Sequence, residues 1–371
     1  MKQSLYQVPE YDQEKINTAV AKIMKDQKVE KDLRPGMKVV IKPNLIMAKP
    51  TSIPATTHPM VVRAVALWLR EKGITDITLA ESSGGPYIAD YMKNIYRVCG
   101  MASLSDVLTL NNDFSSKPVN TAEGFKNHSF NIITPIIEAD YIINICKLKT
   151  HAMTGVSAGI KNLFGVIPGL EKPQLHYMWP DIEDFSNMLL EIARTVKPDL
   201  TIVDAIDAME GNGPTGGTSH PLKLLLGAKD FYTQDYFATT LMQLDPNNIV
   251  MIRQAVERGL AHPDQIELCG DPIPEGLTQF QIPDSIKLDF SNFMPGPLGK
   301  AFAKIASKVL KSFPKVDKEK CVGCAKCAES CPQKIIKIKN KKAVFPRKGC
   351  ISCFCCQEMC PAKAISVKKA L

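Results

Sequence analysis

The chain has 371 residues, of which 45% are hydrophobic and 23% charged, and 12 are cysteines. This composition is typical of a globular protein that is long enough for one large and one small domain, and it excludes a low-complexity chain. No apolar run approaches the roughly 18 residues of a membrane span, and the N-terminus lacks the apolar core of a signal peptide. We therefore expect a cytoplasmic protein without an integral membrane segment.

Charge is divided unevenly along the chain. Residues 291–371 contain 18 Lys and Arg but only four Asp and Glu, whereas acidic residues are in excess before them. The basic excess either balances the negative charge of metal-bound thiolates or forms a docking face. Such a face would suit the acidic main domain or an acidic electron carrier of the ferredoxin or flavodoxin type. Nucleic acid is not expected as a partner, because the basic residues are not interleaved with aromatic ones and no binding motif is present.

The N-terminal part alternates helical and strand patterns. Apolar residues recur every three or four positions in some segments and form short continuous runs in others. Helices are predicted at residues 13–25, 59–72 and 182–196, and strands at 38–41, 77–80, 141–145 and 200–203. Strands separated by helices imply a large, Rossmann-like α/β domain with a mainly parallel sheet, which we expect to span residues 1–285.

Chemically distinctive residues follow each predicted strand. In open α/β sheets, ligands bind beyond the carboxyl ends of the strands, so these segments are expected to form one composite site. They are KPNLIMAKP and TTHP after the first strand, ESSGGP after the second, KLKTHAMTGVSAGIKN after the third, and DAIDAMEGNGPTGG after the fourth. The candidate substrate-binding residues are Lys42, Asn44, His58, Ser82, Gly84, Lys161, Asn162, Glu210 and Asn212.

These motifs also have structural interpretations. ESSGGP could be a turn in which a serine caps the next helix, or its glycines could expose backbone N–H groups to an anion. It lacks the spacing of a nucleotide-binding P-loop. His58 before a proline could support a turn. The glycines of EGNGPTGG either confer mobility or permit the close approach of a planar ligand, and both interpretations stay open.

KLKTH and the following GIKN gather positive charge in a segment that is otherwise apolar and glycine-rich. A solvated surface usually mixes charges, so this pattern favours an anion site. The candidate catalytic residues are His151, Glu81 and Lys149, with His151 or Glu81 as proton donor. Lys42, Lys149 and Lys161 are expected to hold an anionic, conjugated substrate. A purely structural role for His151 is the alternative.

The C-terminal part contains one cysteine spacing twice. CVGCAKCAESCP and CISCFCCQEMCP both contain C-x2-C-x2-C-x3-C-P. This spacing is typical of two [4Fe–4S] clusters, each held by three cysteines of one run and the fourth of the other. A zinc site would not need the doubled pattern. The predicted ligand sets are Cys321, Cys324, Cys327 and Cys360 for one cluster, and Cys350, Cys353, Cys356 and Cys331 for the other.

A small α+β, ferredoxin-like domain is therefore expected at residues 315–371, with a hairpin that turns near Asn340. Residues 286–314 are predicted to form a basic amphipathic linker helix that packs on the body, with membrane binding as the alternative. Cys355 is left over from the spacing. We expect it to be a small apolar side chain, with ligand exchange or an S–H contact to a ligand as alternatives.

The motifs KPNL, TTHP, ESSGGP, KLKTH…TGVSAGIKNLFGVIPG and DAIDAMEGNGPTGG together resemble the family catalogued as domain of unknown function 362. Some members of that family carry a C-terminal two-cluster ferredoxin module. The resemblance covers nearly the whole chain and implies an iron–sulfur protein, without naming a shared reaction. In fold the family is distantly similar to the nickel-pincer racemases, whose histidine pattern does not match this sequence.

Two functions fit these features. In the first, the protein is a reductase: a carrier loads electrons onto the basic module, and two clusters pass them singly to a substrate in the α/β domain. No flavin or nicotinamide fingerprint is present, so any additional organic cofactor stays unidentified. In the second, the protein is an electron carrier or an assembly protein, whose α/β domain binds a partner protein, a cofactor or a metal without catalysis.

Overall fold

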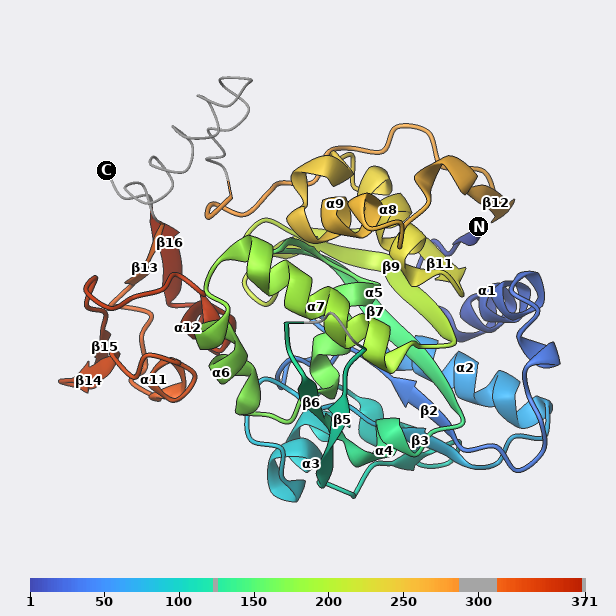
Figure 1. Ribbon diagram of the computed structural model, residues 1–371, viewed down its shortest axis with the longest axis horizontal. Coiled ribbons are helices and arrows are strands. Elements are labelled where there is room, and N and C mark those ends of the chain that lie inside the picture. The colour runs from blue at the N-terminus through green and yellow to red at the C-terminus, as the bar shows by residue number, and fades with distance from the viewer. Residues whose placement is uncertain (123–125, 287–311, 369–371) are drawn as a thin grey trace.

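The computed structural model describes residues 1–122, 126–286 and 312–368. A large α/β body lies beside a small cysteine-rich module (Figure 1). Almost all of the predicted linker helix at 286–314 lies outside the described residues. No helix in the described part of the chain is both long and apolar enough to cross a bilayer.

The body is built on a ten-stranded sheet with the order β12-β1-β11-β9-β7-β2-β3-β4, where β8 pairs with β7 and β10 with β9. The strands are β1 (Lys2–Gln7), β2 (Val39–Lys42), β3 (Ile77–Leu79), β4 (Thr109–Leu110), β7 (Tyr141–His151), β8 (Gly155–Ser157), β9 (Leu200–Glu210), β10 (Thr218–His220), β11 (Leu224–Ala228) and β12 (Glu267–Gly270). Strands β9, β7, β2, β3 and β4 run parallel, whereas β11 is antiparallel to both of its neighbours. The predicted α/β fold class is confirmed.

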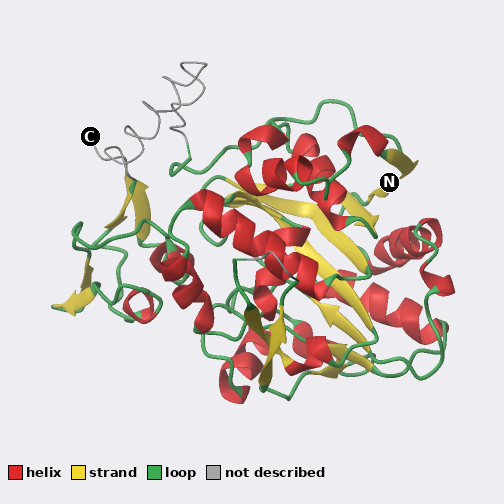
Figure 2. Ribbon diagram, in the orientation of Figure 1, coloured by secondary structure: helices red, strands yellow, loops and turns green. Residues whose placement is uncertain are grey.

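Helices cover both faces of the sheet (Figures 1 and 2). The α-helices of the body are α1 (Gln13–Asp26), α2 (Pro59–Glu71), α3 (Ala89–Val98), α4 (Thr134–Ile137), α5 (Gly159–Asn162), α6 (Glu171–Met178), α7 (Ile182–Val196), α8 (Phe231–Leu241) and α9 (Val250–Glu257). Short 3-10 turns lie at Val29–Lys31, Met101–Leu104, Leu163–Val166, Pro246–Asn248 and Pro263–Gln265, and a separate hairpin joins β5 (Ser116–Asn120) to β6 (Ser129–Ile133).

The two faces follow from the alternation of side chains along each strand. In β2, Val39 and Ile41 pack with α1 and α2, whereas Val40 between them packs with the layer that contains α7. Both layers are almost fully apolar, which is why the strands of this sheet are continuous hydrophobic runs.

The four strands and the three helices that were predicted for the body are present, but two strands are longer than expected. β7 and β9 each extend over 11 residues, so KLKTH and DAIDAME continue the strands and are not loops. The reason is local pairing: β8 folds back on the end of β7, and β10 on the end of β9. β8 and β10 form backbone hydrogen bonds with these two segments, whose polar side chains had indicated loops.

The module contains two antiparallel strand pairs and two short helices. Its elements are β13 (Phe313–Val316), α11 (Lys326–Glu329), β14 (Lys337–Lys339), β15 (Lys342–Val344), α12 (Cys355–Glu358) and β16 (Ile365–Lys368). β13 pairs with β16, and β14 with β15. Asn340 and Lys341 connect β14 to β15 with φ of 49° and 58°, which is the turn type that two-residue hairpins require. The predicted hairpin is confirmed.

The module contacts the body through α12 and the residues around it. The hydroxyl of Thr215, between β9 and β10, donates to the backbone oxygen of Glu358 at 2.8 Å. Phe354 packs against Ala152 at the end of β7. A Cβ on Gly84 would lie 2.7 Å from the sulfur of Met359, so glycine at this position lets the module approach the body closely.

Candidate functional site

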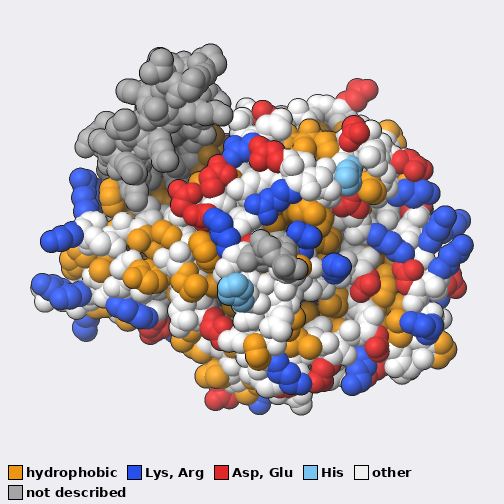
Figure 3. Space-filling view, in the orientation of Figure 1, with side chains coloured by type: hydrophobic (Ala, Val, Ile, Leu, Met, Phe, Trp, Pro, Cys, Tyr) orange, Lys and Arg blue, Asp and Glu red, His pale blue; other side chains and the backbone are white. Residues whose placement is uncertain are grey.

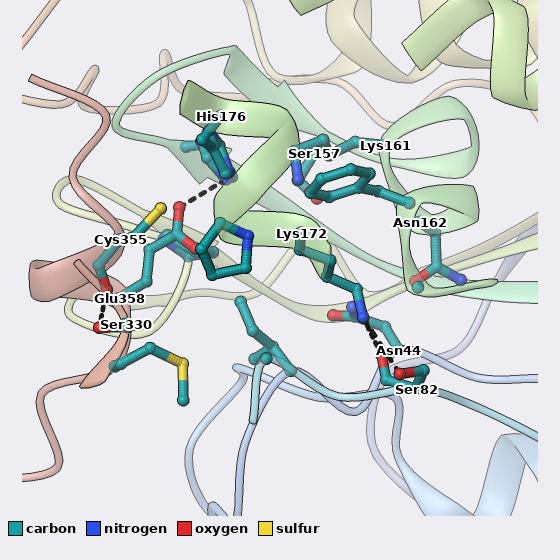
Figure 4. Close-up of a pocket in the computed structure, with 18 of the residues that line it drawn as sticks. Asn44, Ser82, Ser157, Lys161, Asn162, Lys172, His176, Ser330, Cys355 and Glu358 are labelled. Atoms are coloured by element: carbon teal, nitrogen blue, oxygen red, sulfur yellow. Dashed lines mark hydrogen bonds and ion pairs between the residues drawn. The ribbon is translucent and has the colours of Figure 1, made fainter. Parts of the chain in front are cut away.

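A cavity lies between the body and the module, and both domains line it (Figure 4). The body contributes residues that follow β2 and β3, the end of β7, and parts of α5 and α6. The module contributes Ser330, Cys355, Glu358 and Met359. The volume open to the centre of a water-sized atom is about 70 Å³, roughly five times what one water needs. The cavity therefore suits a small molecule.

Lys42 and Glu81 form a buried ion pair at one end of the cavity. Burial lowers the pKa of Lys42 and raises that of Glu81, and the attraction between them opposes both shifts. A side chain on Gly165 would collide with both members of the pair. Glu81 lines the cavity, whereas Lys42 is fully buried behind it and also donates to Pro43 O. Lys42 therefore supports the site from beneath.

Lys149 reaches the cavity from β7. Its ammonium donates to the side-chain oxygen of Asn44 at 2.5 Å and to the backbone oxygen of Ala55 at 2.7 Å. Burial, reinforced by the charges of Lys147 and Lys161, lowers the pKa of Lys149 to about 7. An ammonium has three donors, so one remains for a ligand.

Lys161 is the cation with the fewest competing contacts. It projects from α5, and its Nζ lies 4.6 Å from the centre of the Phe164 ring. Among the described residues we find no hydrogen bond or ion pair from this ammonium. Burial lowers its pKa, and Glu358 and Cys355 oppose that shift. Lys161 is thus the side chain best placed to bind an anion.

His151 and Glu358 meet across the domain boundary. Nδ1 of His151 accepts from the backbone N–H groups of Met153 (3.1 Å) and Thr154 (3.3 Å), so the proton of the neutral ring lies on Nε2. Nε2 is 3.1 Å from Oε1 of Glu358, although the two atoms do not have the geometry of a hydrogen bond. Burial lowers the pKa of His151, and the negative charge of Glu358 opposes this shift.

Glu358 is an anion in this setting. Burial by itself would raise its pKa, but His151, Lys161 and His176 together hold the pKa at about 2. Its side chain is 12% exposed, and in Figure 4 it points from the module into the cavity, as does Cys355. The carboxylate thus faces the basic side chains of the body.

Asn162 lines the cavity with a fixed orientation. Its amide nitrogen donates to Oδ1 of Asn144 at 2.7 Å. Asn144 in turn donates to Gly159 O and to the Thr201 hydroxyl. The side-chain oxygen of Asn162 is buried and accepts no hydrogen bond from the described residues.

Lys172 and His176 on α6 line the cavity as well, and neither is among the candidate site residues taken from the sequence. The ammonium of Lys172 donates to Ser82 O, Ser82 Oγ, Ser83 O and Ile167 O, so both it and Ser82 serve mainly to hold the loop after β3. Burial lowers the pKa of Lys172 to about 7. His176 stacks on Phe185 at 4.3 Å between ring centres, and burial lowers its pKa to about 3.

Four candidate substrate-binding residues do not line this cavity: Lys42, described above, and His58, Glu210 and Asn212. His58 caps α2 through Nδ1 and stacks on Tyr11. Glu210 pairs with His220 at 2.9 Å. Asn212 exchanges hydrogen bonds with Asp284. His58, Glu210 and Asn212 each have partners in the body, and a role for them in substrate binding stays a prediction.

The cysteines surround two separate cavities in the module. One is lined by Cys321, Cys324, Cys327 and Cys360, and the other by Cys331, Cys350, Cys353 and Cys356. In the described residues, no three His, Cys, Asp or Glu side chains converge on one point. The thiols are instead spread around a volume. Four thiolates around such a volume fit a [4Fe–4S] cluster in each cavity.

The two cysteine cavities differ in position. Cys324 is exposed, whereas Cys331, Cys353 and Cys356 are buried. Ser330 and Cys355, which line the interdomain cavity, are the chain neighbours of Cys331 and Cys356. Met359, which also lines the interdomain cavity, precedes Cys360 of the first set. The second set thus has two members whose chain neighbours line the interdomain cavity and the first set has one, and the first set also has the exposed Cys324.

Sequence reasoning missed the contribution of the module to the site. Cys355 was expected to be a small apolar side chain. It is buried, and it also faces the cavity. Glu358 is the only acid among the residues of the second cysteine run. An isolated acid in a basic, cysteine-rich segment was the available signal.

Two family matches cover most of the chain. Residues 39–240 match the family described as domain of unknown function (DUF362), and residues 313–361 match a 4Fe-4S dicluster domain, which indicates [4Fe–4S] binding. The thylakoid-associated protein sll1697 of Synechocystis sp. is 31% identical over 281 residues, which cover 70% of this chain and 84% of that protein.

A solved structure, the lactate racemase apoprotein from Thermoanaerobacterium thermosaccharolyticum, matches with 11% identity and a TM-score of 0.37. The match covers 54% of this chain and 49% of that one. A similarity of this size supports no inference about function.

Proposed function

The chain belongs to the DUF362 family and carries a 4Fe-4S dicluster domain, and on this basis we propose that it is an iron–sulfur reductase. Its substrate would be a small, anionic, conjugated molecule bound in the interdomain cavity. The observation that carries the proposal is the position of α12. This helix contains Cys356, a proposed cluster ligand, and also places Cys355 and Glu358 in the wall of the cavity.

The two cysteine sets are the proposed ligands of two [4Fe–4S] clusters: Cys321, Cys324, Cys327 and Cys360 for the outer cluster, and Cys331, Cys350, Cys353 and Cys356 for the inner one. When bound, the clusters would supply electrons one at a time at the cavity wall. The donor of these electrons would be an acidic carrier of the ferredoxin or flavodoxin type. A cytoplasmic location stays a prediction.

The residues of the cavity would bind the substrate and supply protons. Lys161 and Lys149 hold the anionic group, and the ring of Phe164 lies beside Lys161 to contact the conjugated part. Reduction of a double bond consumes two electrons and two protons. Glu81, whose pKa is raised by burial, is in its protonated form the candidate donor of one proton. Nε2–H of the neutral His151 ring would donate a hydrogen bond to the substrate, and the second proton would come from solvent.

Glu358 would assist His151 without giving up a proton itself. With a pKa of about 2, it stays ionised at neutral pH and attracts the proton that His151 carries. The carrier or assembly function that the sequence also allows does not require a cavity beside the inner cysteine set. The cavity therefore favours the reductase.

The test uses the anaerobically purified full chain with both clusters reduced by dithionite and the excess reductant removed. A panel of small unsaturated carboxylates is added, and cluster reoxidation is followed by visible absorbance and electron paramagnetic resonance. We expect at least one acid to reoxidise the clusters, and Lys161→Gln to slow this about tenfold or more through loss of one charge-assisted contact. Exposed Lys93→Gln is the control. If no acid reoxidises the clusters but a partner protein does, the carrier function replaces the reductase.

A further inference from the structure

The cavity contains fixed hydrogen-bond acceptors as well as cations. Oδ1 of Asn162 is one of them. The amide of Asn144 cannot turn without losing its bonds to Gly159 and Thr201, so its oxygen always faces the amide nitrogen of Asn162. Asn162 must therefore present its oxygen to the cavity, where it finds no donor among the described residues.

Glu358 supplies a second acceptor from the other side. The oxygens of a carboxylate side chain accept hydrogen bonds. Its Oε1 is buried and has no hydrogen-bond donor in the described part of the chain, and the nearby Nε2 of His151 is likewise unpartnered. In Figure 4, Glu358 and Asn162 lie on opposite sides of the cavity.

Unpartnered buried polar atoms are uncommon in folded proteins, and each one calls for a partner. A simple carboxylate would engage Lys161 and His151 but would leave both Asn162 and Glu358 without a donor. A ligand that carries a donor group of its own removes this mismatch.

We propose that the ligand of this cavity is a small acid that also carries a hydroxyl or ammonium group. The acid group binds at Lys161, and the donor group binds at Asn162 Oδ1 or Glu358 Oε1. This inference rests on the proposed function only in placing the substrate in this cavity, because binding requires no electron transfer.

The test compares three acids with the same four-carbon skeleton: succinate without a donor group, malate with a hydroxyl, and aspartate with an ammonium. Each is titrated calorimetrically into the oxidised, cluster-loaded full chain under anaerobic conditions. We expect malate or aspartate to bind at least about tenfold more tightly than succinate, because a site built around a donor group rejects the analogue that lacks it. Which of the two binds more tightly identifies the donor.

Variants separate the role of the two acceptors, Asn162 and Glu358, from the role of the cation Lys161. Asn162→Leu or Glu358→Gln should abolish the preference for the acid that carries a donor group. Lys161→Gln should instead weaken the binding of all three acids by a similar factor. Exposed Asn94→Leu is the matched control, and iron per chain shows whether each variant retains its clusters. Equal binding of the three acids, or binding of none, overturns the inference. If malate or aspartate binds preferentially but no acid reoxidises reduced clusters, the reductase fails and this inference stands.

Discussion

At the scale of single residues, the cations of the cavity differ in what they already bind. Lys172 is surrounded by four oxygens, and Lys42 is paired with Glu81. Within the described residues, Lys149 uses two of its three donors, and the ammonium of Lys161 interacts only with the Phe164 ring. Positive charge alone therefore does not identify the binding residues. The number of unused donors does.

Lys149 predicts a pH dependence. Burial and neighbouring cations lower its pKa to about 7, so the ammonium form that attracts an anion is lost as pH rises above that value. We expect the Kd of the preferred acid to rise by up to about tenfold per pH unit above pH 7. Calorimetric titrations from about pH 6 to about pH 9 measure this. Lys149→Gln should flatten the profile, and a constant Kd in the wild type across this range would contradict the assignment.

Much of the body's side of the site could be predicted from the order of residues along the chain. Asn44 and Glu81 follow parallel strands, and such strands end at one edge of a sheet. His58 follows a strand as well, but its ring faces Tyr11 and caps α2. Which way a side chain points depends on its neighbours in space, and a single sequence does not contain them.

At the scale of secondary-structure elements, α12 connects the two halves of the site. It has only four residues, Cys355–Glu358, and a helix that short is not stable by itself. Its position is set by the cysteine cavities on one side and by the body on the other. The hydrogen bond from Thr215 to the backbone oxygen of Glu358 is one of the contacts that fix it.

Thr215→Val tests the docking of α12. The substitution keeps the shape of the side chain and removes the donor, so we expect the contact between module and body to weaken by about 1 kcal/mol. Hydrogen exchange of the α12 amides should become faster, and iron per chain should not change. Thr218→Val, at an exposed position on β10, is the control. Equal exchange in the two variants would show that this hydrogen bond does not hold the helix.

The ends of the strands, and some whole strands, could not be predicted from the sequence. The apolar segments 141–145 and 200–203 predicted the starts of β7 and β9 correctly, but the polar residues beyond them gave no sign of continuing strands. Strands β1, β11 and β12 were not predicted, because their pairing joins segments that are far apart in the chain. The cavity wall formed by α12 was missed for the same reason.

At the scale of the whole molecule, the charge distribution suggests where a partner docks. In Figure 3, Lys and Arg side chains gather at the end of the module that lies away from the body. The outer cysteine cavity is on the module, with Cys324 exposed and Val322 67% exposed. Lys320 beside it is 68% exposed in its side chain. Basic side chains around the exposed apolar residue Val322 would be complementary to the surface of an acidic redox protein.

This arrangement predicts salt-sensitive electron transfer. We expect the rate at which reduced flavodoxin reduces the full chain to fall as ionic strength rises, because salt screens the attraction between the surfaces. Lys320→Glu should slow the reaction severalfold at low salt and have little effect at high salt, as measured by stopped-flow absorbance. Lys25→Glu at an exposed position of α1, which lies at the opposite end of the molecule from the module (Figure 1), makes the same charge change and should leave the rate unchanged. A rate independent of salt would exclude this docking face.

The position of α12 also links this protein to the supply of iron. Modules built around metal-bound cysteines depend on the metal for their folding, so we expect α12 to take its place only after the clusters are inserted. Without it the cavity lacks Glu358, Cys355 and Met359. A chain made under iron starvation would then be unable to enclose its ligand, and would not withdraw from the metabolite pool a compound that it could not convert.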